Sequence, residues 1–125
     1  MYKRQFNADH SFDPKYLDEL VKESEKNDFV FGTRYNKLSG SDDDTVITLV
    51  GNKIFSFITK KILKIELTDI LFTYVMGKTK SFNNLDLNCI DFTLCVEFPI
   101  KAARKNYIIG TIPSFERVRI GGKKK

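Results

Sequence analysis

Short apolar runs alternate with longer amphipathic segments along the chain, and this alternation restricts the fold more than any other feature of the sequence. Apolar runs bounded by turn residues predict buried strands, whereas apolar residues spaced three and four apart predict helices. The expected strands span 29–31, 70–76 and 107–112, and the expected helices span 13–26, 45–63 and 89–105. We therefore expect an α/β fold with a mixed sheet flanked by helices.

Local signals mark the ends of several elements. Asp13 followed by Pro14 predicts a helix start, because Asp caps free backbone amides and Pro fits the first helical position. Gly77 is expected to end the second of these strands. Pro99 lies inside the third helix and should kink it or split it. Residues 1–5 show no strand pattern and are interpreted as a non-native lead-in.

The helix expected over 45–63 has a wider apolar stripe than one buried face needs. Lysines border this stripe at Lys53, Lys60, Lys61 and Lys64. Two interpretations fit the pattern. We favour a core helix packed between two neighbours, and the alternative is a helix that lies in a bilayer interface with its lysines at the headgroups.

The charges are unevenly distributed. The 125 residues include 21 Lys or Arg and 16 Asp or Glu, and the segment 117–125 holds five of these cations and no acid. A protein that binds nucleic acid more often spreads basic residues over one face, so no nucleic-acid partner is expected. The terminal cluster instead indicates a local anion site, a contact with a membrane surface, or a solvated end.

Composition narrows the class of protein and its compartment. A hydrophobic content of 42% is enough for a core and excludes a disordered chain. The cysteines Cys89 and Cys95 match no zinc or redox spacing, and His10 is the only histidine, so no Cys/His metal site is expected. Two cysteines do not make a disulfide scaffold, which indicates a reducing, cytoplasmic setting.

Candidate ligand-binding residues follow the expected strands. Asn7 and Asp9 precede the first helix, and their oxygens could hold Mg²⁺ or Mn²⁺, or simply form an Asx-turn. Arg34 lies in a long, exposed loop expected over 33–44, where it could pair with a phosphate or be an ordinary turn residue. Asp69 could act as a general base, position a ligand, or belong to a turn.

The late basic segment pairs cations with glycines. Arg117, Arg119 and Lys123 surround Gly121 and Gly122, and such a segment could close over a phosphate. It could equally be a frayed basic terminus.

Taken in order, these motifs resemble the second half of a family-two glycosyltransferase, in the branch of the dolichyl-phosphate-sugar synthases. The order is Asn-Ala-Asp, Asp-Pro with a helix, Gly-Thr-Arg-Tyr, an amphipathic helix into Thr-Asp, and Arg-x-Arg-x-Gly-Gly-Lys. The resemblance covers 6–125 and implies one domain, the acceptor-side portion of a GT-A fold. It also implies that the N-terminal nucleotide-binding half is missing, so we expect an inactive fragment.

The resemblance also assigns roles to residues. It makes Asp9 the second carboxylate of the Asp-x-Asp motif, a ligand of Mg²⁺ or Mn²⁺, with Asn7 in place of the first carboxylate. It gives Asp69 a catalytic or acceptor-positioning role and makes Arg34 a substrate-binding residue. The substrate phosphate would also be contacted by the late basic residues Arg117, Arg119 and Lys123.

The implied activity is transfer of a sugar from a nucleotide-sugar donor to a polyprenyl-phosphate or saccharide acceptor. This would take place in the cytoplasm, with peripheral contact at the inner face of the membrane. The alternative is a non-catalytic binding module whose basic C-terminal tail meets anionic lipid or nucleic acid. The two differ at Asp9, because only the transferase needs a divalent metal there.

Overall fold

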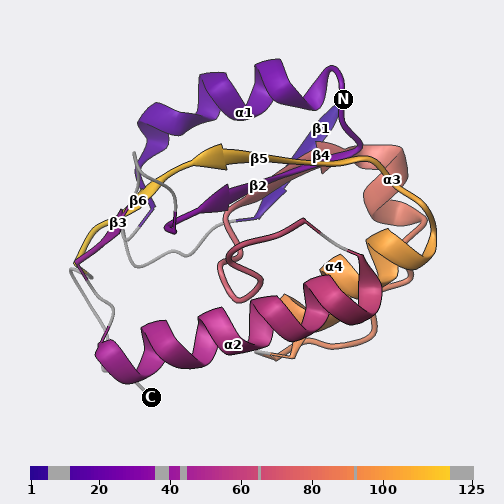
Figure 1. Cartoon of the computed structure of the whole chain (residues 1–125). Coiled ribbons are helices and arrows are strands. Elements are labelled where there is room, and N and C mark those ends of the chain that lie inside the picture. The colour runs from indigo at the N-terminus through magenta and orange to yellow at the C-terminus, as the bar shows by residue number, and fades with distance from the viewer. Residues whose placement is uncertain (6–11, 36–39, 43–44, 65, 92, 119–125) are drawn as a thin grey trace.

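A mixed, four-stranded sheet forms the centre of the computed structural model, which describes residues 1–5, 12–35, 40–42, 45–64, 66–91 and 93–118 (Figure 1). The strands lie in the order β1, β4, β2, β5, and their bounds are Tyr2–Gln5, Val75–Lys78, Phe29–Thr33 and Ile109–Pro113. The strand β4 runs antiparallel to both neighbours, whereas β2 and β5 are parallel. The expected mixed α/β architecture is confirmed.

Helices cover both faces of this sheet. One face is covered by α1, which contacts β2, β4 and β5, and the other face lies toward α4 and α2 (Figure 1). The helices are η1 Pro14–Tyr16, α1 Leu17–Ser24, α2 Val46–Leu63, α3 Thr79–Asn83 and α4 Leu94–Arg104. A second, two-stranded parallel sheet joins β3 Gly40–Ser41 to β6 Phe115–Glu116.

Strand β2 sits at the centre of the core because all five of its residues are buried. Phe29 and Phe31 face a cluster that includes Phe98 and Ala102 of α4. Val30 points the other way, into the cluster beneath α1. The period of two along the strand thus supplies apolar side chains to both layers.

Two strand expectations were wrong in detail. Residues 1–5 were expected to show no strand, yet β1 pairs with β4 from Tyr2 opposite Lys78 to Gln5 opposite Val75. An edge strand is held by backbone hydrogen bonds on one side and needs no apolar run, so its sequence gives no signal. The next strand starts at Val75, so Gly77 lies inside it rather than at its end. Whether residues 1–5 are non-native stays a prediction.

The helices follow the sequence signals more closely. Thr45 caps α2, since its hydroxyl accepts a hydrogen bond from the amide of Thr48. Asp13 accepts one from the amide of Lys15 at the start of η1. Pro99 does not split α4, which runs through it as one helix.

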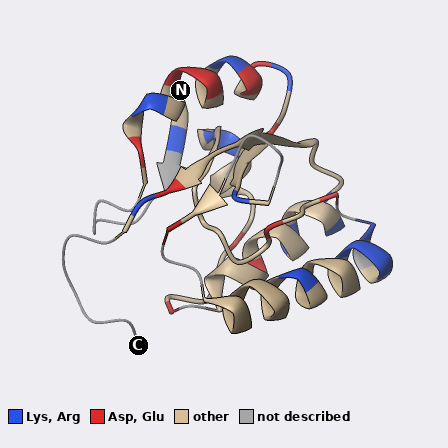
Figure 2. Ribbon diagram, turned by 60° about the vertical axis from the view of Figure 1, so that its left-hand side comes forward, with Lys and Arg blue, Asp and Glu red and all other residues tan. Residues whose placement is uncertain are grey.

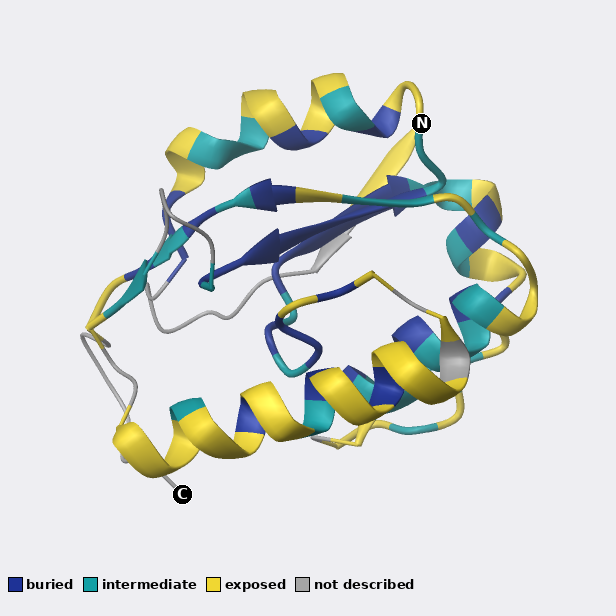
Figure 3. Cartoon of the chain, viewed as in Figure 1, coloured by how far each residue is buried: buried dark blue, intermediate teal, exposed yellow. Residues whose placement is uncertain are grey.

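Helix α2 is oriented opposite to our expectation. Its buried residues are Asn52, Ser56 and Thr59, all polar, while most of its apolar side chains are exposed (Figure 3). The favoured interpretation of a core helix between two neighbours is therefore wrong for the described chain. The sequence showed the width of the apolar stripe but not which side of the helix faces the protein.

A glycine pair tests the packing around the sheet. A Cβ added at Gly77 would lie 2.7 Å from the backbone oxygen of Asp28 and would also overlap the ring of Phe29. Gly77→Ala is therefore expected to lower the free energy of unfolding by about 1–3 kcal/mol in urea denaturation. Gly51→Ala is the control, because no atom lies within 4 Å of its added Cβ and alanine favours the helix by roughly 0.5–1 kcal/mol. Equal effects would contradict the described close approach.

Candidate functional site

Polar side chains from remote parts of the sequence meet at the edge of the sheet where β2 and β5 end and β4 begins. The amide of Gly32 donates to the carbonyl of Tyr74 (2.7 Å), and the amide of Ser114 donates to the carbonyl of Thr33 (2.9 Å). These bonds align the three chain segments that leave the sheet here. The left-hand end of the sheet in Figure 1 is this edge.

Arg34 and Asp69 form a buried, bidentate ion pair at this edge. The Arg34 Nε donates to Asp69 Oδ2 at 2.7 Å, and Nη2 donates to Oδ1 at 2.9 Å. The backbone amide of Arg34 adds a third bond to Oδ2 at 3.0 Å. The two residues are 9% and 1% exposed, so water screens the pair little.

Glu116 binds the other side of the same guanidinium. Arg34 Nη1 donates to Glu116 Oε2 at 2.7 Å, and the Ser41 hydroxyl donates to the same oxygen at 2.7 Å. Glu116 is buried because β6 pairs with β3 on one side and forms a bridge to Phe12. Two carboxylates thus flank one cation, and the three side chains together carry a single negative charge.

Burial and charge act in opposite directions on this arginine. Burial by itself would lower the pKa of Arg34, but the hydrogen bonds and charge of Asp69, followed by those of Glu116, raise it above its usual value. The guanidinium also lies 4.7 Å from the ring centroid of Phe72, where a cation–π contact is favourable. Arg34 is therefore a permanent cation.

Helix α2 contributes a further donor to the cluster. The side-chain amide of Asn52 donates to Asp69 Oδ1 at 2.5 Å and to the Tyr35 hydroxyl at 3.2 Å. Each oxygen of Asp69 then accepts two hydrogen bonds, which is about the capacity of a carboxylate. This arrangement orients the Asp69 carboxylate and leaves its oxygens little capacity to accept a proton from a substrate.

Asp13 anchors the segment that follows β5. Its carboxylate accepts a hydrogen bond from Arg117 at 2.5 Å, and its backbone oxygen accepts one from the Tyr74 hydroxyl at 2.9 Å. Burial opposes ionisation of Asp13, but hydrogen bonds from Lys15 and the positive charge of Arg117 lower its pKa overall. Arg117, one cation of the late basic segment, is thus bound by a carboxylate of the same chain.

The structure brings together some of the predicted site residues. Arg34 and Asp69, singled out separately and 35 positions apart, are direct partners. The expected long, exposed loop over 33–44 is wrong for its first part, since Arg34 is buried. Asn7, Asp9, Arg119 and Lys123 lie outside the described residues, and their roles stay predictions. Among the described residues, no three His, Cys, Asp or Glu side chains gather closely enough to hold a metal ion.

Sequence reasoning missed Glu116 and Asn52. A signal existed for each. Glu116 follows the strand ending at Pro113, so the rule that pointed to Arg34 applies to it as well. Asn52, Ser56 and Thr59 recur at spacings of four and three among the apolar residues of α2, which marks a polar face.

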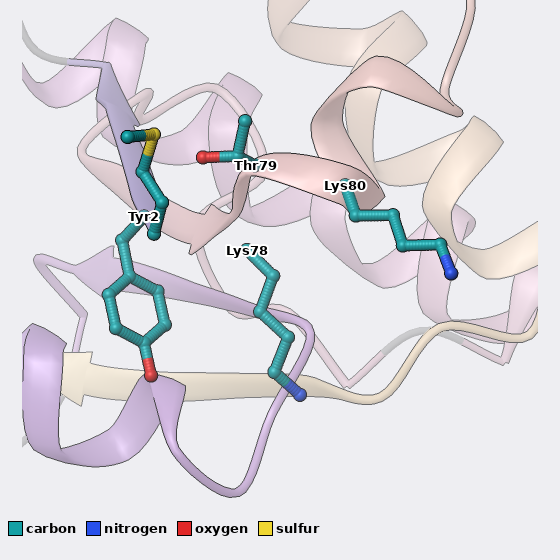
Figure 4. Close-up of a pocket in the computed structure, with 5 residues that line it drawn as sticks. Tyr2, Lys78, Thr79 and Lys80 are labelled. Carbon is teal, nitrogen blue, oxygen red and sulfur yellow. The ribbon is translucent and has the colours of Figure 1, made fainter.

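A separate hollow of about 480 Å³ lies at the other end of β1 and β4, lined by Met1, Tyr2, Lys78, Thr79 and Lys80 (Figure 4). It is open to solvent and shares no lining residue with the Arg34 cluster.

None of the helices in the described ranges combines the length and apolar character needed to cross a membrane. Comparison with models of known protein families gives no match to this chain, and a search of curated proteins gives none either.

Proposed function

We propose that the chain is the acceptor-side part of a family-two glycosyltransferase whose site includes the edge where Arg34, Asp69 and Glu116 meet. The observation that supports this proposal is the convergence of the motifs. Gly-Thr-Arg-Tyr and Thr-Asp are far apart in sequence, yet their charged residues form one buried pair. This bidentate pair lies at the carboxyl ends of strands, which is where ligand-binding groups gather in open α/β sheets.

The start of the chain reaches the same edge. Strand β1 ends at Gln5, which is paired with Val75 at the beginning of β4. Asn7 and Asp9 follow directly in the sequence. Their amide and carboxylate oxygens are the hard donors that Mg²⁺ and Mn²⁺ prefer, so the donor types fit such an ion. Because Asn7 is neutral, the two residues supply one negative charge fewer than a pair of carboxylates would. When bound, the ion would supply positive charge to the departing nucleoside diphosphate.

In this proposal Arg34 and Asp69 position the site. Arg34 connects the segment after β2 to Asp69 before β4 and to Glu116 in β6. The three segments are thereby held in fixed relative positions, and substrate groups meet a prearranged surface. A direct contact of Arg34 with a substrate phosphate stays a prediction.

The hydrogen bonding of Asp69 favours one kind of acceptor. A hydroxyl acceptor needs a base to take its proton, whereas a phosphate acceptor is already ionised. Because both oxygens of Asp69 are occupied by donors, the geometry suits a polyprenyl-phosphate acceptor better than a saccharide hydroxyl. The late basic segment, which starts at Arg117, would attract that phosphate.

Metal-dependent nucleotide binding tests the proposal. Binding of UDP and GDP with Mn²⁺ would be measured by calorimetry on the chain and on a version extended upstream. We expect binding by the extended version, and Asp9→Ala should weaken it by at least about tenfold, since a direct charged ligand is lost. Asp18→Ala, at an exposed position of α1, is the control.

If neither version binds a nucleotide with metal, or if Asp18→Ala weakens binding as much as Asp9→Ala, the transferase proposal fails. Salt-sensitive binding of the basic C-terminal tail to lipid or nucleic acid, with no metal-dependent binding of nucleotide, would favour the binding module instead.

A further inference from the structure

Helix α2 presents an apolar surface to solvent. We call this surface the α2 outer face, and its exposed side chains are Val46, Ile47, Val50, Ile54, Phe57, Ile58 and Ile62. Phe57 and Ile62 are 66% and 71% exposed. Figure 3 shows the exposed residues along the outer side of α2, and no described segment covers them. A continuous apolar surface of this kind marks an interaction site.

The orientation of α2 is fixed by polar contacts on its inner side. Asn52 donates to the buried carboxylate of Asp69, and the amide of Ile70 donates to the Ser56 hydroxyl at 3.3 Å. Thr59 bonds to carbonyls of its own helix. Turning the helix to bury its apolar side would leave Asp69 without one donor. The outer face is therefore apolar in the folded protein.

The charged residues within the segment 45–64 all have one sign. The segment 45–64 contains four lysines, all exposed, and no acid. Lys53 and Lys60 are seven residues apart and so lie along one edge of the apolar stripe, whereas Lys61 and Lys64 lie at its C-terminal end. Figure 2 shows this combination of blue and tan along α2, with acidic residues placed on other elements. Only Lys60 has a described acidic partner, Glu66, at 3.3 Å between two exposed side chains.

We infer that the α2 outer face binds the surface of a bilayer containing anionic lipids. The helix would lie flat, with its apolar side chains among the acyl chains and its lysines at the headgroups. The charge of the helix favours this occupant, because anionic lipids supply the opposite charge to its four lysines together with an apolar layer.

This inference goes beyond the proposed transferase and does not depend on it. If the transferase proposal also holds, the same helix has its outer side at the lipid and its inner side at Asp69. A lipid-linked acceptor would then reach the site without leaving the membrane surface.

Vesicle flotation tests the inference, without metal or nucleotide. The full chain should float with phosphatidylcholine vesicles that contain phosphatidylglycerol, and much less with phosphatidylcholine alone. Ile54→Ser with Phe57→Ser should weaken this binding by at least about tenfold, because two apolar side chains no longer enter the lipid. Lys53→Gln with Lys60→Gln should weaken it by about 25-fold, at roughly fivefold for each lysine.

The control replaces two exposed apolar residues outside α2, Ile90→Ser with Ile108→Ser, and should leave vesicle binding unchanged. All these positions are exposed, so circular dichroism should show folded proteins. The inference is overturned if the wild-type chain does not bind the anionic vesicles, or if the control weakens binding as much as the α2 variants. It is also overturned if the chain is a dimer that Ile54→Ser with Phe57→Ser dissociates, while vesicles are not bound. None of these results affects the Asp9 experiment, so failure of the two proposals is distinguishable.

Discussion

Replacing Asp69 by alanine is expected to lower the free energy of unfolding by about 3–5 kcal/mol. The variant removes one of the carboxylates that bind the buried Arg34 guanidinium and leaves its pair with Glu116 in place. It also removes the acceptor of the Asn52 amide. Burying a charge or a polar group without its partner costs free energy, and both costs fall at one place. Urea denaturation of the two proteins measures the difference.

A double-mutant cycle separates the ion pair from other effects of truncation. The free energies of unfolding of Arg34→Ala, Asp69→Ala and the combined variant would be compared. We expect the loss in the combined variant to be smaller than the sum of the two single losses by about 1–3 kcal/mol. Lys78 with Asp28 provides a matched control, because this pair is 3.5 Å apart and more exposed, so its coupling should be below about 1 kcal/mol. Additive losses for Arg34 and Asp69 would contradict the direct, buried contact.

Phe98→Ala is expected to cost about 3–5 kcal/mol of unfolding free energy, because it empties the space between α4 and the sheet. The Phe98 ring lies 5.0 Å from that of Phe29 and 5.3 Å from that of Phe31, measured between centroids, and 5.1 Å from that of Phe82. Its side chain is 1% exposed. The loss therefore combines transfer of the ring, a cavity, and several aromatic contacts.

Thermal and urea unfolding would compare the free energy of unfolding of Phe98→Ala with those of two other variants. Phe98→Leu keeps much of the volume and should cost clearly less than the alanine variant. Ile90→Ala changes a fully exposed side chain and should lie within about 0.5 kcal/mol of the wild type. A small effect of Phe98→Ala would show that α4 does not pack on β2 as described.

The sequence predicted features of the fold that depend on neighbouring residues. The bounds of α2 follow from the Thr45 cap and from helical spacing, and η1 begins at Pro14 as the Asp13-Pro14 signal indicated. The buried strand at Phe29 follows from its apolar run. These signals are local, so tertiary contacts do not need to be known in order to interpret them.

Features that depend on remote pairing were missed. Strand β1 is held by backbone bonds to Val75 and its neighbours, which leave no mark on residue type. Arg34 and Asp69 were both chosen as candidates, yet nothing in either segment indicated that they would bind each other. Glu116 joins them only because β6 pairs with β3. Such contacts arise from the topology of the sheet, which single-sequence patterns do not determine.

The inverted polarity of α2 has a consequence for cooperativity. Its attachment to the domain rests on a few hydrogen bonds, chiefly from Asn52 to Asp69 and from Ile70 to Ser56, rather than on a buried apolar face. Local opening of such an element costs less free energy than opening of β2 or α4. When α2 detaches, Asp69 loses one of its four hydrogen-bond donors. Anything that holds the outer side of α2 in place therefore also favours the state in which both oxygens of Asp69 are fully hydrogen-bonded.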